Sequence, residues 1–193
     1  MKKVFSILTL IILITACKKR PPPNPANDLL KIGDSYQGGI VAYILQPGDS
    51  GYDANVQHGL IAATADQGKN IEWKNCCIFG IAVHDTALGT GSNNTTAIIE
   101  AQGNPPSGKT YAAYLCRNYN GGDYNDWFLP SLYELYKLYL NREAVGGFLD
   151  NLYYSSNQSN QDFSVWYQNF DSIGYQFTID PGFGLCVRAV RYF

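Results

Sequence analysis

The alternation of apolar and polar positions predicts strands at both ends of the domain and helices between them. The clearest helix begins at Ser131, because Glu134 three residues later completes a capping-box pattern and an apolar face follows. We expect strands over 36–45, 58–63, 153–156, 163–170, 175–179 and 185–192, and helices over 95–102, 110–118 and from 131 to about 142. This order predicts an α+β fold, with antiparallel sheet and two or three helices inserted mid-chain, rather than a βαβ series.

The N-terminal pattern indicates export. Two lysines precede an uncharged, mainly apolar run over residues 4–14, and small residues then precede Cys17. The run is shorter than the ~20 residues that span a bilayer, which disfavours the alternative of a signal-anchor helix with an incidental cysteine. The pattern resembles a bacterial lipobox, which implies cleavage after residue 16 and lipid attachment at Cys17. More than one acyl chain on that cysteine would hold the protein stably on a membrane.

A basic and proline-rich linker over 17–31 follows the expected lipid site. Prolines favour extended, semi-rigid backbone, so this segment is typical of a stalk that lifts a folded domain, 32–193, off the lipid. Lys18 stands where an aspartate would favour the inner membrane, which points to the outer membrane. We therefore expect a lipid-anchored protein of the cell envelope. The sequence leaves two orientations open, with the domain facing either the periplasm or the cell surface.

The net charge of the folded part of the chain excludes some classes of ligand. The sequence holds 14 basic and 16 acidic residues, and five of the basic ones lie before residue 21, so the rest of the chain carries 9 against 16, a net charge of −7. Nucleic acids and sulfated polysaccharides require clustered lysine and arginine, so we expect neither as a ligand. The remaining partners are the membrane, through the anchor, and a glycan or an envelope protein.

Four cysteines follow the expected lipid site: Cys76, Cys77, Cys116 and Cys186. An oxidising compartment favours disulfides, and four cysteines allow three pairings. A bond between the adjacent pair would be strained, so each is expected to reach a distant partner. Two histidines without CxxC or HxxxH spacing disfavour zinc, and no twelve-residue calcium loop is present. We expect no metal and no cofactor.

A set of motifs resembles a known family. They lie at 87–91, 94–95, 112–116, 122–131 (GDYNDWFLPS), 134–135, 153–156, 166–170 and 187–191. Together they are similar to the Lcl C-terminal domain family, named after the end domain of a bacterial collagen-like adhesin. The resemblance covers roughly 32–193 and implies an extracytoplasmic α+β domain related to C-type-lectin-like and formylglycine-generating-enzyme folds, with adhesion or glycan binding in some relatives. The named adhesin binds sulfated glycosaminoglycans, and the net negative charge of this domain disfavours that activity here. The sequence contains no collagen-like region, so trimerisation through such a region is not expected either.

Two arginines near the C-terminus predict a structural clamp. Arg188 and Arg191 are three apart on an expected strand and so point to opposite faces, and one that faces inward needs a carboxylate. We expect Arg188 or Arg191 to pair with Asp126 or Glu134. Trp127, next to that aspartate, is expected to fill the core rather than to form a ligand lip.

Binding is favoured over catalysis. No nucleophile elbow, metalloprotease, Walker or Rossmann motif is present, and an enzyme like the formylglycine-generating group would need a free, exposed cysteine. Flat aromatic rings mixed with amides suit neutral sugars. The candidate ligand residues are Tyr153, Tyr154, Asn157, Gln158, Trp166 and Gln168, together with Tyr167. The alternatives are that half of these rings belong to the core, and that the protein is a structural or protein-interaction lipoprotein.

Overall fold

The computed structural model describes a folded domain that begins after residue 28. The described residues are 29–75, 80–161 and 163–193. Several predictions concern residues outside these ranges, namely the signal peptide 1–16, Cys17, most of the linker 17–31, Cys76 and Cys77. Within the described ranges no helix is long and apolar enough to cross a membrane.

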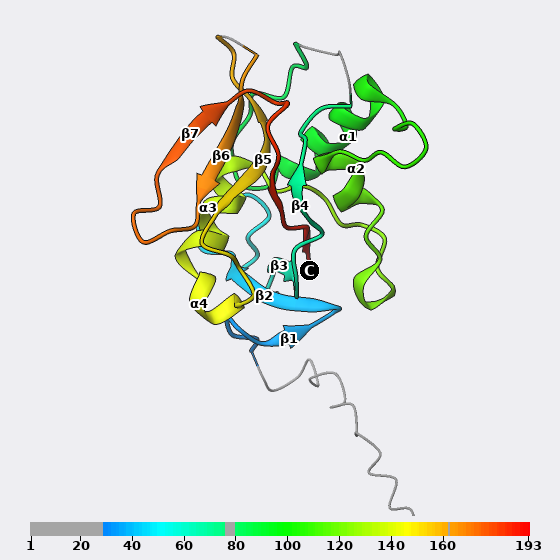
Figure 1. The fold of residues 1–193 in the computed structure, drawn as a ribbon. Coiled ribbons are helices and arrows are strands. Elements are labelled where there is room, and N and C mark those ends of the chain that lie inside the picture. Colours follow the sequence, from blue (N-terminus) through cyan, green and yellow to red (C-terminus); the bar gives the residue numbers. More distant parts are fainter. Residues whose placement is uncertain (1–28, 76–79, 162) are drawn as a thin grey trace, which may run out of the picture.

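In the described part of the chain, nine strands form two sheets, and Figure 1 shows their arrangement. The first sheet has the order β1-β2-β3-β9, from β1 (Ser35–Tyr36), β2 (Gly39–Ile44), β3 (Gly59–Ala63) and β9 (Val190–Tyr192). The second has the order β4-β8-β5-β6-β7, from β4 (Gly68–Ile71), β8 (Leu185–Val187), β5 (Leu152–Gln158), β6 (Val165–Asn169) and β7 (Gln176–Ile179). All pairings are antiparallel except that of β5 with β8. The fold is therefore α+β, as the sequence pattern predicted.

The helices lie between the two groups of strands in the sequence. They are α1 (Gly91–Gln102), α2 (Ala112–Arg117), α3 (Leu132–Leu140) and α4 (Arg142–Val145), with a 3-10 turn over Gly121–Asp123. The three expected helices are present, and the short α4 was not predicted. Ser131 caps α3, and the capping box with Glu134 is complete. Figure 1 shows α1 and α2 on one side of the second sheet and α3 on the other, with α4 beside β2 of the first sheet.

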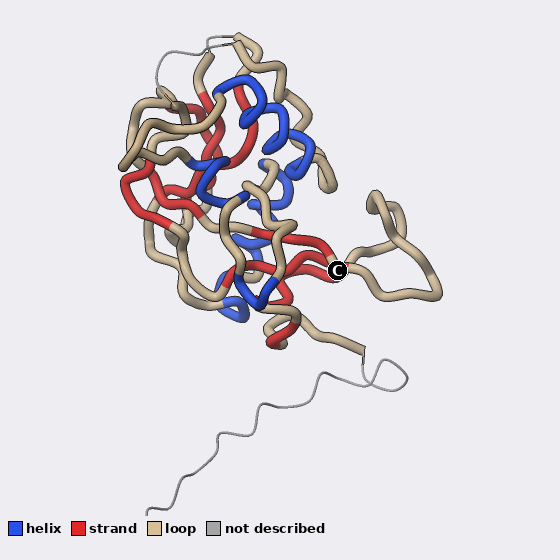
Figure 2. The backbone as a smooth tube through the Cα atoms, turned by 90° about the vertical axis from the view of Figure 1, so that its right-hand side faces the viewer, coloured by secondary structure: helices blue, strands red, loops and turns tan. Residues whose placement is uncertain are grey.

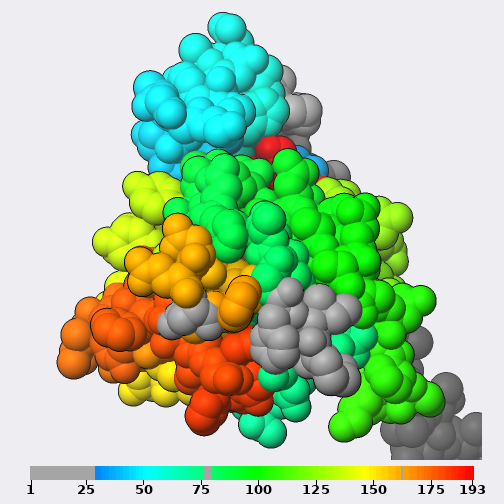
Figure 3. Space-filling view, turned by 90° about the horizontal axis from the view of Figure 1, so that it is seen from above, coloured from blue at the N-terminus to red at the C-terminus, as the bar shows by residue number. Residues whose placement is uncertain are grey.

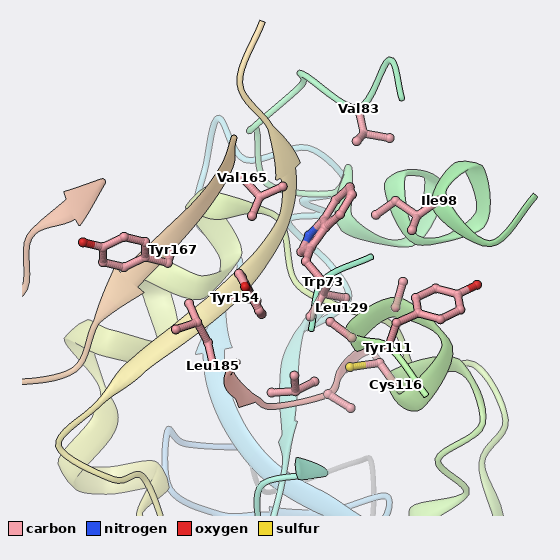
Figure 4. Close-up of a cluster of buried hydrophobic side chains, with 14 of the residues drawn as sticks. Trp73, Val83, Ile98, Tyr111, Cys116, Leu129, Tyr154, Val165, Tyr167 and Leu185 are labelled. Atoms are coloured by element: carbon pink, nitrogen blue, oxygen red, sulfur yellow. The ribbon is translucent and has the colours of Figure 1, made fainter. Parts of the chain in front are cut away.

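Because helices cover both faces of the second sheet, its central strand β5 is buried on both sides. Tyr154 joins a core cluster that includes Trp73, on the side of α1, as Figure 4 shows. Its neighbour Tyr153 joins a second cluster with Leu135 of α3. Successive residues of a strand point to opposite faces, so burial of both tyrosines requires cover on both faces.

Two predicted strands are divided in the structure. The segment 185–192 forms β8 in the second sheet and then β9 in the first, so it joins the two sheets instead of continuing through one. The segment 36–45 turns at Gly38, which has φ +84° and approaches Gly121 so closely that a Cβ would stand 2.5 Å from its carbonyl oxygen. Only glycine fits there. The β2–β3 connection, residues 45–58, projects from the body beside the C-terminus (Figures 2 and 3).

Candidate functional site

The expected clamp is confirmed for Arg191 and Asp126. Arg191 Nε donates to Asp126 Oδ1 at 2.6 Å, and Nη2 donates to Oδ2 at 2.9 Å, so the pair is bidentate. The guanidinium also lies 3.9 Å from the ring centroid of Tyr124. The hydrogen bonds from Arg191 hold the pKa of Asp126 below its usual range. Trp127 is fully buried in the core, as expected, and this motif is therefore architecture.

Arg188 has a different partner from the one predicted. Its guanidinium is buried and lies 2.6 Å from Asp66 Oδ1, and it also donates to the carbonyl oxygens of Ala63 and Gly147 at 2.9 and 2.6 Å. The ring of Phe148 lies against it, 4.2 Å from centroid to Cζ. Asp66 stands just before β4, a strand that the sequence pattern missed, so nothing marked it as a partner.

Glu134 is not an ion-pair partner. Its buried carboxylate accepts hydrogen bonds from Gly89 N at 2.9 Å, Ser131 N at 2.7 Å and the Tyr192 hydroxyl at 2.8 Å. Burial raises the pKa of Glu134, and these donors oppose that rise. One side chain thereby holds together the start of α3, the loop before α1 and the last strand.

The predicted ligand residues are largely inaccessible, and the prediction that they form a binding surface is wrong for most of them. Most of them are buried, namely Tyr153, Tyr154, Asn157, Gln158 and Gln168, and Trp166 of β6 is half-buried. Their polar atoms make hydrogen bonds within the domain instead.

The hydrogen bonds of this group show the same role. The Tyr154 hydroxyl donates to Phe183 O at 2.5 Å, and the Tyr153 hydroxyl donates to Asp66 Oδ2 at 2.9 Å. Asn157 accepts from Leu132 N at 2.7 Å. Burial raises the pKa of both tyrosines. The strand pattern indicated one exposed face, whereas α3 covers the face that would have been open.

The two described cysteines are buried free thiols. Cys116 lies in the cluster with Trp73, and Cys186 lies in the cluster with Leu135, so they do not face each other. Burial raises the pKa of each thiol. Both thiols are free, so the described residues contain none of the expected cross-links to Cys116 and Cys186, whose expected partners Cys76 and Cys77 lie outside the described residues. Within the described ranges, no group of three or more histidine, cysteine or acidic side chains could hold a metal ion.

One surface hollow of the described domain offers little to a ligand. It has a volume of about 380 Å³ and lies beside α4 and the β6–β7 loop. Its carboxylates are Glu143, Asp150 and Asp171. Its two aromatic rings pack against each other, with the centroids of Phe148 and Phe170 4.5 Å apart, and Phe170 is buried. Neither ring therefore offers a free face on which a ligand could stack.

The second hollow, which we call the tyrosine hollow, lies between α3 and β7. It has a volume of about 210 Å³ and is lined by Thr86, Leu132, Tyr133, Tyr136 and Gln176. Tyr133 and Tyr136 are three apart on the helix and share a face, with ring centroids 6.3 Å apart. Tyr133 is 46% exposed, so part of its ring is open to a ligand.

Polar atoms in the tyrosine hollow are available for hydrogen bonding. The Gln176 side-chain nitrogen donates to Gln168 Oε1 at 2.9 Å, which fixes the orientation of the amide. Among the described residues, nothing donates to Gln176 Oε1, and the hydroxyl of Thr86 makes no hydrogen bond. Lys137 lies beside the hollow with its ammonium 4.8 Å from the centroid of Tyr133.

Sequence reasoning missed this hollow. The spacing of Tyr133 and Tyr136 places them away from the leucine face of α3, and that signal was present in the sequence. Their proximity to Gln176, which lies 43 and 40 positions later in the sequence, could not be predicted from the local pattern. In comparisons with known proteins, no family model matches the sequence of this chain, and no curated protein matches it either. The similarity to the Lcl C-terminal domain family stays a prediction.

Proposed function

We propose that this protein is a lipid-anchored protein of the cell envelope whose domain binds neutral glycans through the tyrosine hollow. The observation that carries the proposal is the pair of adjacent rings, Tyr133 and Tyr136, on an exposed helix face beside unpaired polar atoms. The C–H face of a sugar packs on an aromatic ring, and the phenol supplies a polar handle as well.

The polar lining supports a sugar in particular. A pyranose presents hydroxyl groups that both donate and accept. The oxygen of Gln176 can accept from such a group, and the hydroxyl of Thr86 can do either. Because the Gln176 amide is held by Gln168, its oxygen needs no reordering when a ligand arrives. The net charge of −7 favours a neutral glycan over a sulfated one.

The proposed location fits a binding role. A lipid at Cys17 would hold the domain at the membrane, and the proline-rich linker would keep it clear of the lipid surface. Several anchored copies that bind one polysaccharide would gain avidity even where a single hollow binds weakly.

The test is a screen of neutral glycans on an array, followed by calorimetric titration of a bound oligosaccharide. Tyr133→Ala removes the exposed ring, and Tyr52→Ala is the matched control because Tyr52 is 40% exposed in the projecting β2–β3 connection. An aromatic contact contributes about 0.5–1.5 kcal/mol, so we expect Tyr133→Ala to raise Kd by up to about tenfold and the control to leave it unchanged. Absence of binding by the folded protein, or equal Kd values for both variants, would count against the proposal.

A further inference from the structure

Strand β7 forms the outer edge of the second sheet. Its one pairing in the described part of the chain is with β6, and Figure 1 shows β7 at the periphery of the molecule. An unpaired edge presents backbone N–H and C=O groups to any strand that approaches.

The register shows which backbone groups face outward. Asn169 N donates to Tyr175 O at 3.0 Å, and Tyr167 pairs with Phe177 two residues further on. Since residues of an antiparallel strand alternate in the direction of their hydrogen bonds, positions 175, 177 and 179 face β6. The N–H and C=O groups of Gln176 and Thr178 therefore point away from the sheet.

This edge lacks the usual protection against pairing. Soluble proteins place lysine or proline on exposed edge strands, or cover them. The stretch 173–179 contains no charged residue and no proline. It exposes apolar side chains instead: Phe177 is 64% exposed, and Ile173 and Tyr175 are exposed as well.

We propose that β7 pairs antiparallel with β7 of a second copy of this chain, about a two-fold axis at Phe177. In that register Gln176 lies opposite Thr178 of the partner subunit, so the outward backbone groups of the two strands meet each other. Phe177 lies opposite Phe177 of the partner subunit at a position without backbone hydrogen bonds, where side chains approach most closely. The result is a continuous sheet across two subunits.

Self-complementarity is the reason to choose a second copy over another partner. The apolar Tyr175 meets Ile179 of the partner subunit, and no like charges stand opposite each other. An isologous contact of this kind closes after two subunits and does not propagate. The pairing requires no ligand, so it stands or fails independently of the proposed glycan binding. It would also place both tyrosine hollows on the same side of the joined sheet, because Gln176 lies on the α3 face in each subunit.

Cysteine cross-linking of the full chain tests the register. A cysteine at position 177 would meet its symmetry mate at a Cα separation of about 4.5 Å, which lies within the range for a disulfide of about 4.4–6.8 Å. Phe177→Cys should give a dimer band on a non-reducing gel that reductant removes. Leu140→Cys is the matched control, because Leu140 is 52% exposed on α3. Both variants keep all the native cysteines, so they differ only in the position of the added thiol. A monomer for Phe177→Cys, or equal dimer for both variants, overturns the proposal.

A second measurement does not depend on an added thiol. Phe177→Lys places like charges opposite each other at the two-fold axis, whereas Phe183→Lys adds the same charge at a residue 59% exposed elsewhere. Light scattering should give twice the chain mass for the unmodified protein and for Phe183→Lys, and half that value for Phe177→Lys. Chain mass for the unmodified protein, or a dimer that persists in Phe177→Lys, contradicts the proposal.

Discussion

Replacing Glu134 by alanine will destabilise the domain more than most single substitutions. The carboxylate is buried and accepts from three donors, at Ser131 N, Gly89 N and the Tyr192 hydroxyl. Those donors belong to three segments far apart in the sequence. The substitution therefore loosens the contact between α3, the loop before α1 and β9.

The magnitude follows from the donors left behind. A buried donor without a partner costs about 1–3 kcal/mol. The Tyr192 hydroxyl can rotate, and water can enter a polar cavity, so the three costs do not add in full. We expect Glu134→Ala to lower the free energy of unfolding by about 3–5 kcal/mol. Glu134→Gln keeps one carbonyl oxygen but turns an amide N–H₂ toward a backbone donor, so it should cost less, about 1–3 kcal/mol.

Urea unfolding followed by circular dichroism and tryptophan fluorescence measures these differences. Glu143→Ala is the control, because its side chain is 94% exposed and lies 3.9 Å from Arg142, so it should change stability by no more than about 0.5 kcal/mol. A loss below about 1 kcal/mol for Glu134→Ala, or a loss equal to that of the control, would show that the three donors do not depend on this carboxylate.

The difference in stability between the unmodified protein and Glu134→Gln should also depend on pH. Burial raises the pKa of Glu134 in the folded state, so the folded protein holds this proton more tightly than the unfolded chain. The stability contribution of the group is fully present below its ordinary pKa and declines as pH rises through the folded value. The gap in stability between the unmodified protein and Glu134→Gln should therefore narrow as pH rises across that window, and a gap that widens would contradict the sign.

Three further outcomes can be checked by the same unfolding assay. Asp66→Ala leaves the buried Arg188 without its carboxylate and should cost about 3–5 kcal/mol, and a loss as small as that of a surface pair would refute the assignment. Hydrogen bonds lower the pKa of Asp126, so its contribution is present above the ordinary aspartate pKa and is lost as pH falls through the folded value, while Asp126→Asn should show no such loss. Gly38→Ala, where a Cβ meets backbone at 2.5 Å, should destabilise more than Gly48→Ala, which has open space and bears only the left-handed strain of about 1–2 kcal/mol; equal losses would show that the close approach is relieved.

Local signals in the sequence predicted the elements that depend on local chemistry. The cap at Ser131 and the apolar spacing after it predicted α3, and the structure confirms both. The need of an inward-facing arginine for a carboxylate predicted that Arg188 or Arg191 would pair with Asp126 or Glu134, and the pair of Arg191 with Asp126 confirms this. In each of these cases, the residue type and its spacing carry the physical requirement.

Contacts between distant segments were not predicted in the same way. The tyrosines of β5 are buried on both faces because α1 and α3 cover the sheet, and strand alternation contains no information about that cover. Arg188 pairs with Asp66 because β8 lies beside β4, which local pattern did not reveal. The tyrosine hollow likewise depends on the approach of Gln176 to Tyr133 across the packing of α3 on the sheet.

The central claim is that ligands reach this domain at the tyrosine hollow, and residue-resolved NMR tests it most directly. A neutral oligosaccharide selected on the array would be titrated into the isotope-labelled full chain. We predict that the largest shift changes occur at Tyr133, Tyr136 and Gln176. Saturable changes centred on Trp166 or on the β2–β3 connection, with the hollow unaffected, would contradict the account.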